Sequence, residues 1–167
     1  MKWVLTVLVA GIGAWYFLVG SRYISEADVR AQYQSEANWL DEGQHAKICA
    51  AFDEAYVGHV ASVTAAGRVL EETNKAQSCA ALEAFFGTLK KLNDTVGGGV
   101  VTNSDVTLEK VVISADRRTA TVSVRSEVRV GTEKMLMMKM SSEGTDTLIK
   151  RHGSVYRLRA EGKTSTQ

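Results

Sequence analysis

The clearest pattern in this sequence is the alternation of apolar and polar residues between positions 120 and 130. A β-strand points successive side chains to opposite faces, so this alternation predicts a strand with one buried and one wet face. Antiparallel sheets tolerate a wet face, and the second half of the chain is therefore predicted to form an antiparallel sheet. The apolar positions are Ala120, Val122, Val124, Val128 and Val130, and the polar positions are Thr121, Ser123, Arg125, Glu127 and Arg129.

Other segments of the chain are also predicted as strands, because β-forming residues lie between turn signals. Residues 56–72 are predicted to form a hairpin that turns at Ala65-Ala66-Gly67, and a helix is the alternative for this segment. The polar tail is predicted to be disordered over residues 163–167. The remaining strands are Val106–Ala115, Met135–Ile149 with a bend near Gly144, and Val155–Ala160.

Helical spacing of apolar residues marks the first half of the chain, so the fold class is predicted to be α+β. Ser25 is predicted to cap a helix that ends near Gly43, and a short helix follows from His45 to Glu54. A second long helix begins after Thr73 or Asn74, and the glycine-rich residues 93–104 behind it are predicted to be flexible. The apolar positions are Val29, Tyr33, Ala37 and Leu40 in the first helix and Leu82, Phe85, Phe86, Leu89 and Leu92 in the second long one.

The N-terminal segment carries no charge from Trp3 to Gly20, a run of 18 residues. As a helix it would be roughly 27 Å long, close to the hydrocarbon thickness of a bilayer. It predicts a transmembrane anchor within residues 1–23, with Lys2 on the cytoplasmic side, and one domain over residues 24–162. In a bacterium the domain would then lie in the periplasm or outside the cell, tethered to the inner membrane. A signal peptide cleaved near Gly20 and Ser21, or a buried helix of a cytosolic protein, are the alternatives.

The chain has two cysteines, Cys49 and Cys79. An even pair in an oxidising compartment is typical of a disulfide, and a bridge here would close a loop of about 30 residues. Two buried thiols on apolar helix faces are the alternative. No CxxC motif and no nearby pair of histidines points to redox or metal chemistry.

Charge and composition argue against several classes of function. The formal net charge is +1, so no nucleic-acid partner is expected. The three histidines are too scattered to define a metal site, and we expect neither a metal nor another cofactor. The thioether groups of Met135, Met137, Met138 and Met140 suit copper(I), but strand alternation divides them between two faces, which favours a packing role.

The predicted order of elements is helix, short helix, hairpin, long helix and a meander of long strands. This order resembles the nuclear transport factor 2-like superfamily, which includes SnoaL-like and ketosteroid-isomerase-like domains. Three stretches also resemble the family: NWLDEGQHAKICAAFDEAYV at the first two helices, ISADRRTATVSV at a strand-turn-strand, and KRHGSVYRL at the final turn. The resemblance covers residues 25–162 and implies a cone, in which a curved sheet wraps around helices and leaves a pocket.

The resemblance implies a pocket rather than one reaction, because the family includes isomerases, dehydratases, cyclases and pockets without known chemistry. Its enzymes use a buried acid, or an acid/base pair, assisted by a tyrosine or histidine. The candidates here are Asp53, Tyr56 and His59, where the short helix meets the hairpin. An acidic helix end followed by a half-exposed strand is the alternative interpretation.

Two functional hypotheses follow from the sequence. The first is a membrane-anchored, extracytoplasmic module that binds a small apolar ligand or an envelope protein without catalysis. The second is an enzyme of the isomerase, dehydratase or cyclase type, in which Asp53 acts as base and Tyr56 or His59 assists. The spacing of these residues matches no catalytic set of the family, which favours the first hypothesis. Dimerisation through the open sheet face, common in such folds, is a further expectation.

Overall fold

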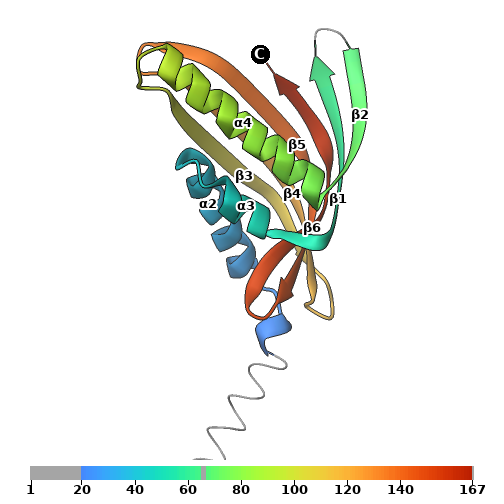
Figure 1. The fold of residues 1–167 in the computed structure, drawn as a ribbon. Helices are drawn as coiled ribbons and strands as arrows, with labels where there is room; N and C mark the ends of the chain where they lie inside the picture. The colour runs from blue at the N-terminus through green and yellow to red at the C-terminus, as the bar shows by residue number, and fades with distance from the viewer. Residues whose placement is uncertain (1–19, 65–66, 167) are drawn as a thin grey trace, which may run out of the picture.

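The computed structural model describes residues 20–64 and 67–166 (Figure 1). Six strands form one sheet in the order β2-β1-β6-β5-β4-β3. Strands β1 and β6 are parallel, and the other neighbours are antiparallel, which confirms the α+β class and the predicted meander. The described elements are η1 (Gly20–Arg22), α2 (Glu26–Asp41), α3 (His45–Ala50), β1 (Phe52–Thr64), β2 (Gly67–Asn74), α4 (Lys75–Thr95), β3 (Val101–Ile113), β4 (Thr119–Thr132), β5 (Met135–Arg151) and β6 (Ser154–Thr166).

The sheet is strongly curved, and the three α-helices lie on its concave side (Figure 1). Within the sheet, Gly144 of β5 faces Gly162 of β6. A Cβ atom on Gly144 would overlap the carbonyl oxygen of Glu161, so the two strands can approach this closely only without side chains. Strand β5 runs through Gly144 without a break in its pairing, and its irregularity in register with β6 lies between Thr147 and Leu148.

The buried residues form two clusters on the concave side. The larger one joins α2 to the sheet and contains fully buried positions of the alternating strand, Ala120 and Val122, as the sequence predicts. The smaller one lies where α3 meets β1 and contains Ile48, Phe52 and Tyr56. A pocket lies between the two clusters and is lined by residues of both.

The two long helices begin at the predicted caps. The Ser25 hydroxyl accepts a hydrogen bond from the Asp28 amide, and the Asp28 carboxylate accepts one from the Ser25 amide. Asn74 and Gln77 form the same reciprocal arrangement at the start of α4. These capping boxes satisfy amide groups that have no partner inside the helix, which fixes where each helix starts.

A disulfide joins Cys49 of α3 to Cys79 of α4, with the Cα atoms 5.5 Å apart. Of the two states that the sequence leaves open for this pair, the structure contains the bridge. Helix α4 has no fully buried residue. It lies at the mouth of the cone, where the apolar face of the helix is only partly covered by the rest of the domain. The disulfide is therefore the covalent attachment of a helix that packing holds weakly.

The short helix ends earlier than predicted, at Ala50 rather than Glu54. Residues from Phe52 onward belong to β1, because Phe52 is in parallel register with Arg157 of β6 and the Arg157 amide donates to the Ala51 carbonyl oxygen at 2.8 Å. The predicted hairpin at residues 56–72 is confirmed and is longer at both ends. Its turn, residues 65–66, lies outside the described residues.

The tail and the glycine-rich connection are also more ordered than predicted. Strand β6 continues to Thr166, so the prediction of disorder from residue 163 is wrong for residues 163–166. These residues pair with β5 on one side and, up to Ser165, with β1 on the other, which supplies backbone hydrogen bonds that their polar side chains do not reveal. Helix α4 extends to Thr95 and β3 starts at Val101, which shortens the predicted 93–104 loop.

The predicted anchor lies almost entirely outside the described residues, which begin at Gly20. Among the residues that the structure describes, no helix is long and apolar enough to cross a membrane. Residues just behind the segment pack on the strand turns of the domain. The Ile24 amide donates to the Arg117 carbonyl oxygen at 2.8 Å, and the Ile24 side chain is fully buried.

Candidate functional site

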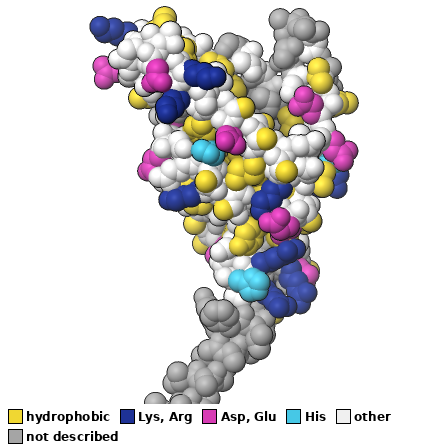
Figure 2. Space-filling view, viewed as in Figure 1, with side chains coloured by type: hydrophobic (Ala, Val, Ile, Leu, Met, Phe, Trp, Pro, Cys, Tyr) yellow, Lys and Arg dark blue, Asp and Glu magenta, His cyan; other side chains and the backbone are white. Residues whose placement is uncertain are grey.

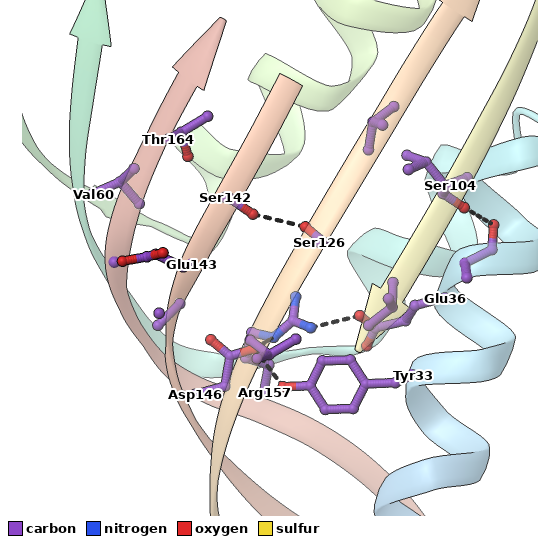
Figure 3. Close-up of a pocket in the computed structure, with 18 of the residues that line it drawn as sticks. Tyr33, Glu36, Val60, Ser104, Ser126, Ser142, Glu143, Asp146, Arg157 and Thr164 are labelled. Atoms are coloured by element: carbon purple, nitrogen blue, oxygen red, sulfur yellow. Dashed lines mark hydrogen bonds and ion pairs between the residues drawn. The ribbon is translucent and has the colours of Figure 1, made fainter. Parts of the chain in front are cut away.

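A pocket of about 270 Å³ lies between the concave face of the sheet and the helices (Figure 3). The apolar part of its helical side comes from Leu40 of α2, Ile48 of α3 and Leu82 of α4. The space equals the liquid volume of about nine water molecules, just below the usual range for pockets that bind small organic molecules. The sheet side contributes Val60, Val106, Val124, Val128, Ser126, Ser142, Gly144, Gly162, Ala160 and Thr164.

The pocket is hollow because the concave-facing residues of β4, β5 and β6 are small. Ser126, Ser142 and Thr164 are in register across these three strands, and all three line the pocket. The hydroxyl groups of Ser126 and Ser142 are 2.7 Å apart and share a hydrogen bond. The next row toward the base contains the Gly144 and Gly162 pair. The small residues of this wall therefore leave room for a ligand and present hydroxyl groups to it.

The base of the pocket holds one cation between two carboxylates. Arg157 of β6 donates from Nη2 to the Glu36 carboxylate at 2.6 Å. Its Nε lies 3.0 Å from Oδ2 of Asp146, an ion-pair distance without the angle of a hydrogen bond. The side chains of Arg157, Glu36 and Asp146 are only 15%, 12% and 10% exposed. Burial opposes the charge of Arg157, but the two carboxylates outweigh it and hold the pKa of the guanidinium well above its usual value.

Tyr33 of α2 completes this base. Its hydroxyl donates to Oδ2 of Asp146 at 2.6 Å, and its ring lies beside the guanidinium, whose Cζ is 5.5 Å from the ring centroid (Figure 3). Burial raises the pKa of Tyr33 far above its ordinary value of 10.0, and the neighbouring Asp146 carboxylate adds to the rise. The Tyr33 hydroxyl therefore stays neutral into the alkaline range and keeps its hydrogen bond to Asp146.

Replacing Tyr33 by phenylalanine is expected to lower the free energy of unfolding by about 2 kcal/mol, because a buried hydrogen bond to a carboxylate is lost. The raised pKa also predicts a pH effect: the unfolded tyrosine ionises from about pH 10 while the buried one stays neutral, so wild-type stability falls above that pH. Urea unfolding at pH 7 and pH 11 measures both effects, and the variant should lose less stability at alkaline pH than the wild type.

Tyr156→Phe is the control, because the Tyr156 hydroxyl makes no hydrogen bond with the described residues. Equal effects of the two substitutions would contradict the prediction.

The three candidate residues predicted from sequence do not line the pocket and are not brought together. Asp53 is 4% exposed, and its carboxylate lies 3.1 Å from Arg151 and accepts the Ala55 amide. Tyr56 is part of the smaller core cluster, where burial raises its pKa. His59 is half-exposed on β1, 3.8 Å from Glu72 of β2.

Sequence reasoning missed Glu36, Asp146 and Arg157. The sequence does contain a signal for two of them. Asp146 is two positions from buried Leu148 in β5, and Arg157 is two positions from buried Val155 in β6, so each charged side chain lies on the same face of its strand as a core residue. A charged residue in phase with core residues indicates a buried ion pair or a functional group. Within residues 20–64 and 67–166, no group of three or more His, Cys, Asp or Glu side chains is arranged to hold a metal ion.

No family model and no curated protein matches the sequence. Solved structures do match the fold. A proposed scytalone dehydratase from Novosphingobium aromaticivorans aligns with a TM-score of 0.61 at 16% identity, over 84% of this chain and 85% of the other. A ketosteroid isomerase-like protein from Erwinia carotovora atroseptica aligns at 0.54 and 12% identity, over 86% and 98%. The nuclear transport factor 2-like protein from Cytophaga hutchinsonii aligns at 0.54 and 11% identity, over 84% and 98%.

The chain has the nuclear transport factor 2-like fold. Identities this low show the fold and leave the activity of the domain open. The cone and its pocket, which the resemblance of the sequence implied, are confirmed.

The convex face of this nuclear transport factor 2-like domain is covered by ion pairs. Arg125, Glu127 and Arg129 alternate with pocket-lining residues of β4 and so lie on the convex face, as predicted. Their exposed pairs, such as Arg125 with Glu109 at 2.9 Å, each contribute little to stability. Figure 2 shows charges of both signs interspersed over the face in view, in keeping with the small net charge. A homodimer through the open face stays a prediction.

Proposed function

We propose that this domain binds a small organic molecule in the pocket of the cone and that the N-terminal segment tethers it to the outer face of a bacterial inner membrane. The observation that carries the binding proposal is the pocket itself. It has an apolar helical side, a wall of hydroxyl groups and a charged base. A few placed polar groups in an apolar cavity are typical of ligand sites. The uncharged run from Trp3 to Gly20 supports the tether.

Binding without catalysis is favoured because both acids at the pocket base are held in ion pairs with Arg157. Among the contacts of the described residues, only one of their four oxygens, Oδ1 of Asp146, is open to a ligand. A general base needs a carboxylate oxygen within reach of the substrate proton. Glu36 accepts hydrogen bonds from Arg157 on one oxygen and from Gln32, at 2.8 Å, on the other. Oδ2 of Asp146 faces both Arg157 and Tyr33. The acids therefore serve mainly to hold the guanidinium and the tyrosine in place.

An enzyme of the isomerase, dehydratase or cyclase type is the second candidate. The observation that favours it is the Tyr33 hydroxyl beside Asp146 at the pocket base, since an acid paired with a tyrosine can move a proton on a bound substrate. Turnover of a co-purified ligand that Asp146→Asn abolishes, with the fold intact, would decide for this candidate.

Native mass spectrometry of the purified full chain, compared with its denatured mass, tests the binding proposal. We expect an additional small mass that is lost on denaturation. Ser142→Leu should abolish it, because the larger side chain would occupy the pocket from the β5 wall, where Ser142 bonds Ser126 and not Arg157. Ser141→Leu is the matched control, because the neighbouring residue points to the convex face and does not line the pocket.

A bound mass that survives Ser142→Leu would place the ligand outside the pocket and contradict the proposal. A wild-type chain that is always empty would direct the search to a protein partner at the membrane. The denatured mass of the same sample also tests the tether, since loss of the residues up to about Gly20 would replace the anchor by a cleaved signal peptide.

A further inference from the structure

The charged groups around the pocket leave one negative charge in excess. Glu143 is paired with Lys163, and Glu161 with Arg159, so these four side chains balance one another. At the base, however, Glu36 and Asp146 share the single cation Arg157. The raised pKa of Tyr33 keeps that side chain neutral. The excess negative charge therefore lies at the buried base rather than at the rim.

Asp146 has an oxygen that the protein does not use. Both partners of its carboxylate, the Tyr33 hydroxyl and the Arg157 Nε, contact the same atom, Oδ2. Within residues 20–64 and 67–166, no side chain or amide donates a hydrogen bond to Oδ1. Asp146 lines the pocket, and Figure 3 shows its carboxylate at the base beside Arg157, with one oxygen turned away from Tyr33. A side chain that is about nine-tenths buried thus offers an open acceptor to a ligand.

We propose that the ligand carries a cationic hydrogen-bond donor, of the primary ammonium class, that binds Oδ1 of Asp146. This inference rests on the proposed function, because it names the chemistry of the molecule that the pocket takes. An ammonium group would satisfy the open oxygen and neutralise the excess charge of the base. Opposite charges attract much more strongly in a partly dry pocket than in bulk water. The apolar part of the same molecule would lie against Leu40, Ile48 and Leu82.

A carboxylate ligand is disfavoured, although an arginine is present. Two nitrogens of Arg157 face Glu36 and Asp146, at 2.6 Å and 3.0 Å. An anion that reached the guanidinium would lie close to both carboxylates and would double the excess negative charge of the base. Like charges at such short range cost free energy unless one is protonated.

Titration of the purified full chain with three probes of one shape tests the inference: benzylamine, which is protonated at neutral pH, benzyl alcohol and sodium benzoate. Ligand-observed NMR gives the dissociation constants. We expect benzylamine to bind at least about tenfold more tightly than benzoate, a difference of about 1.4 kcal/mol, with the alcohol between them. Asp146→Asn should remove the preference for the amine over the alcohol, and Ser142→Leu should remove binding of all three.

The outcomes separate the inference from the proposed function. If benzoate binds as tightly as benzylamine and its binding is lost in Ser142→Leu, the cationic ligand is overturned but the pocket remains a binding site. Amine binding that persists in Ser142→Leu would place it on the exposed surface and overturn the inference. Absence of binding for all three probes would count against both. The wild-type series alone decides the charge preference, so the test holds even if Asp146→Asn does not fold.

Discussion

Arg157→Ala is expected to lower the free energy of unfolding by about 3 to 5 kcal/mol, more than any other single substitution proposed for this domain. The expected loss comes from the two carboxylates that pair with Arg157. Glu36 and Asp146 would remain buried without their shared cation, and a buried carboxylate without a partner is strongly destabilising. Denaturant unfolding monitored by circular dichroism measures the loss.

The matched control is Arg159→Ala, two residues along the same strand. Arg159 is 53% exposed and pairs with the exposed Glu161, so its loss should cost less than about 1 kcal/mol. A second variant separates burial from pairing: Glu36→Gln, Asp146→Asn and Arg157→Met together remove all three charges and should recover most of the stability. A small effect of Arg157→Ala, equal to that of Arg159→Ala, would show that the cluster does not need its cation.

Replacing both cysteines by alanine is expected to cost about 3 to 4 kcal/mol, the chain-entropy value for a loop of this length. The bridge spans a sequence separation of 30 and holds α4, none of whose residues is fully buried. Beyond the loss of stability, we expect faster amide hydrogen exchange in α4, because that helix depends most on the bridge. Exchange in β4, which contains fully buried residues, serves as the internal reference.

A double variant with unchanged stability and unchanged exchange in α4 would contradict this role of the disulfide. Wild-type protein under a reductant provides a second comparison, since it removes the bridge without changing the side-chain volumes. The two preparations should lose the same free energy if the bridge acts through the unfolded chain.

The sequence predicted best what depends on neighbours in the chain. The alternation from Ala120 to Val130 identified β4, and Ser25 and Asn74 marked the helix starts. The errors concern pairing between distant segments. The parallel contact of β1 with β6 moved Phe52 and Asp53 from a helix into a strand and ordered the polar tail, and no local pattern encodes that contact.

The candidate residues lie outside the pocket for the same reason. Asp53, Tyr56 and His59 are close in sequence, but the pocket is lined by residues from both ends of the domain. Tyr33 and Asp146, which share a hydrogen bond, are 113 positions apart. The alternation of residues along β5 and β6 could suggest that Asp146 and Arg157 are buried. It could not show that Arg157 reaches Glu36 of α2.

The position of β6 within the sheet also sets the order in which the molecule can assemble. Strand β6 is the last element of the domain to leave the ribosome, yet it lies between β1 and β5. Until it arrives, the β1–β2 hairpin and the β3–β5 meander are two separate pieces, each with an open strand edge that can pair with another chain. The sheet can therefore close only after synthesis of the domain is complete. In a chain exported across a membrane, the two pieces of the sheet would stay separate until the final strand has crossed.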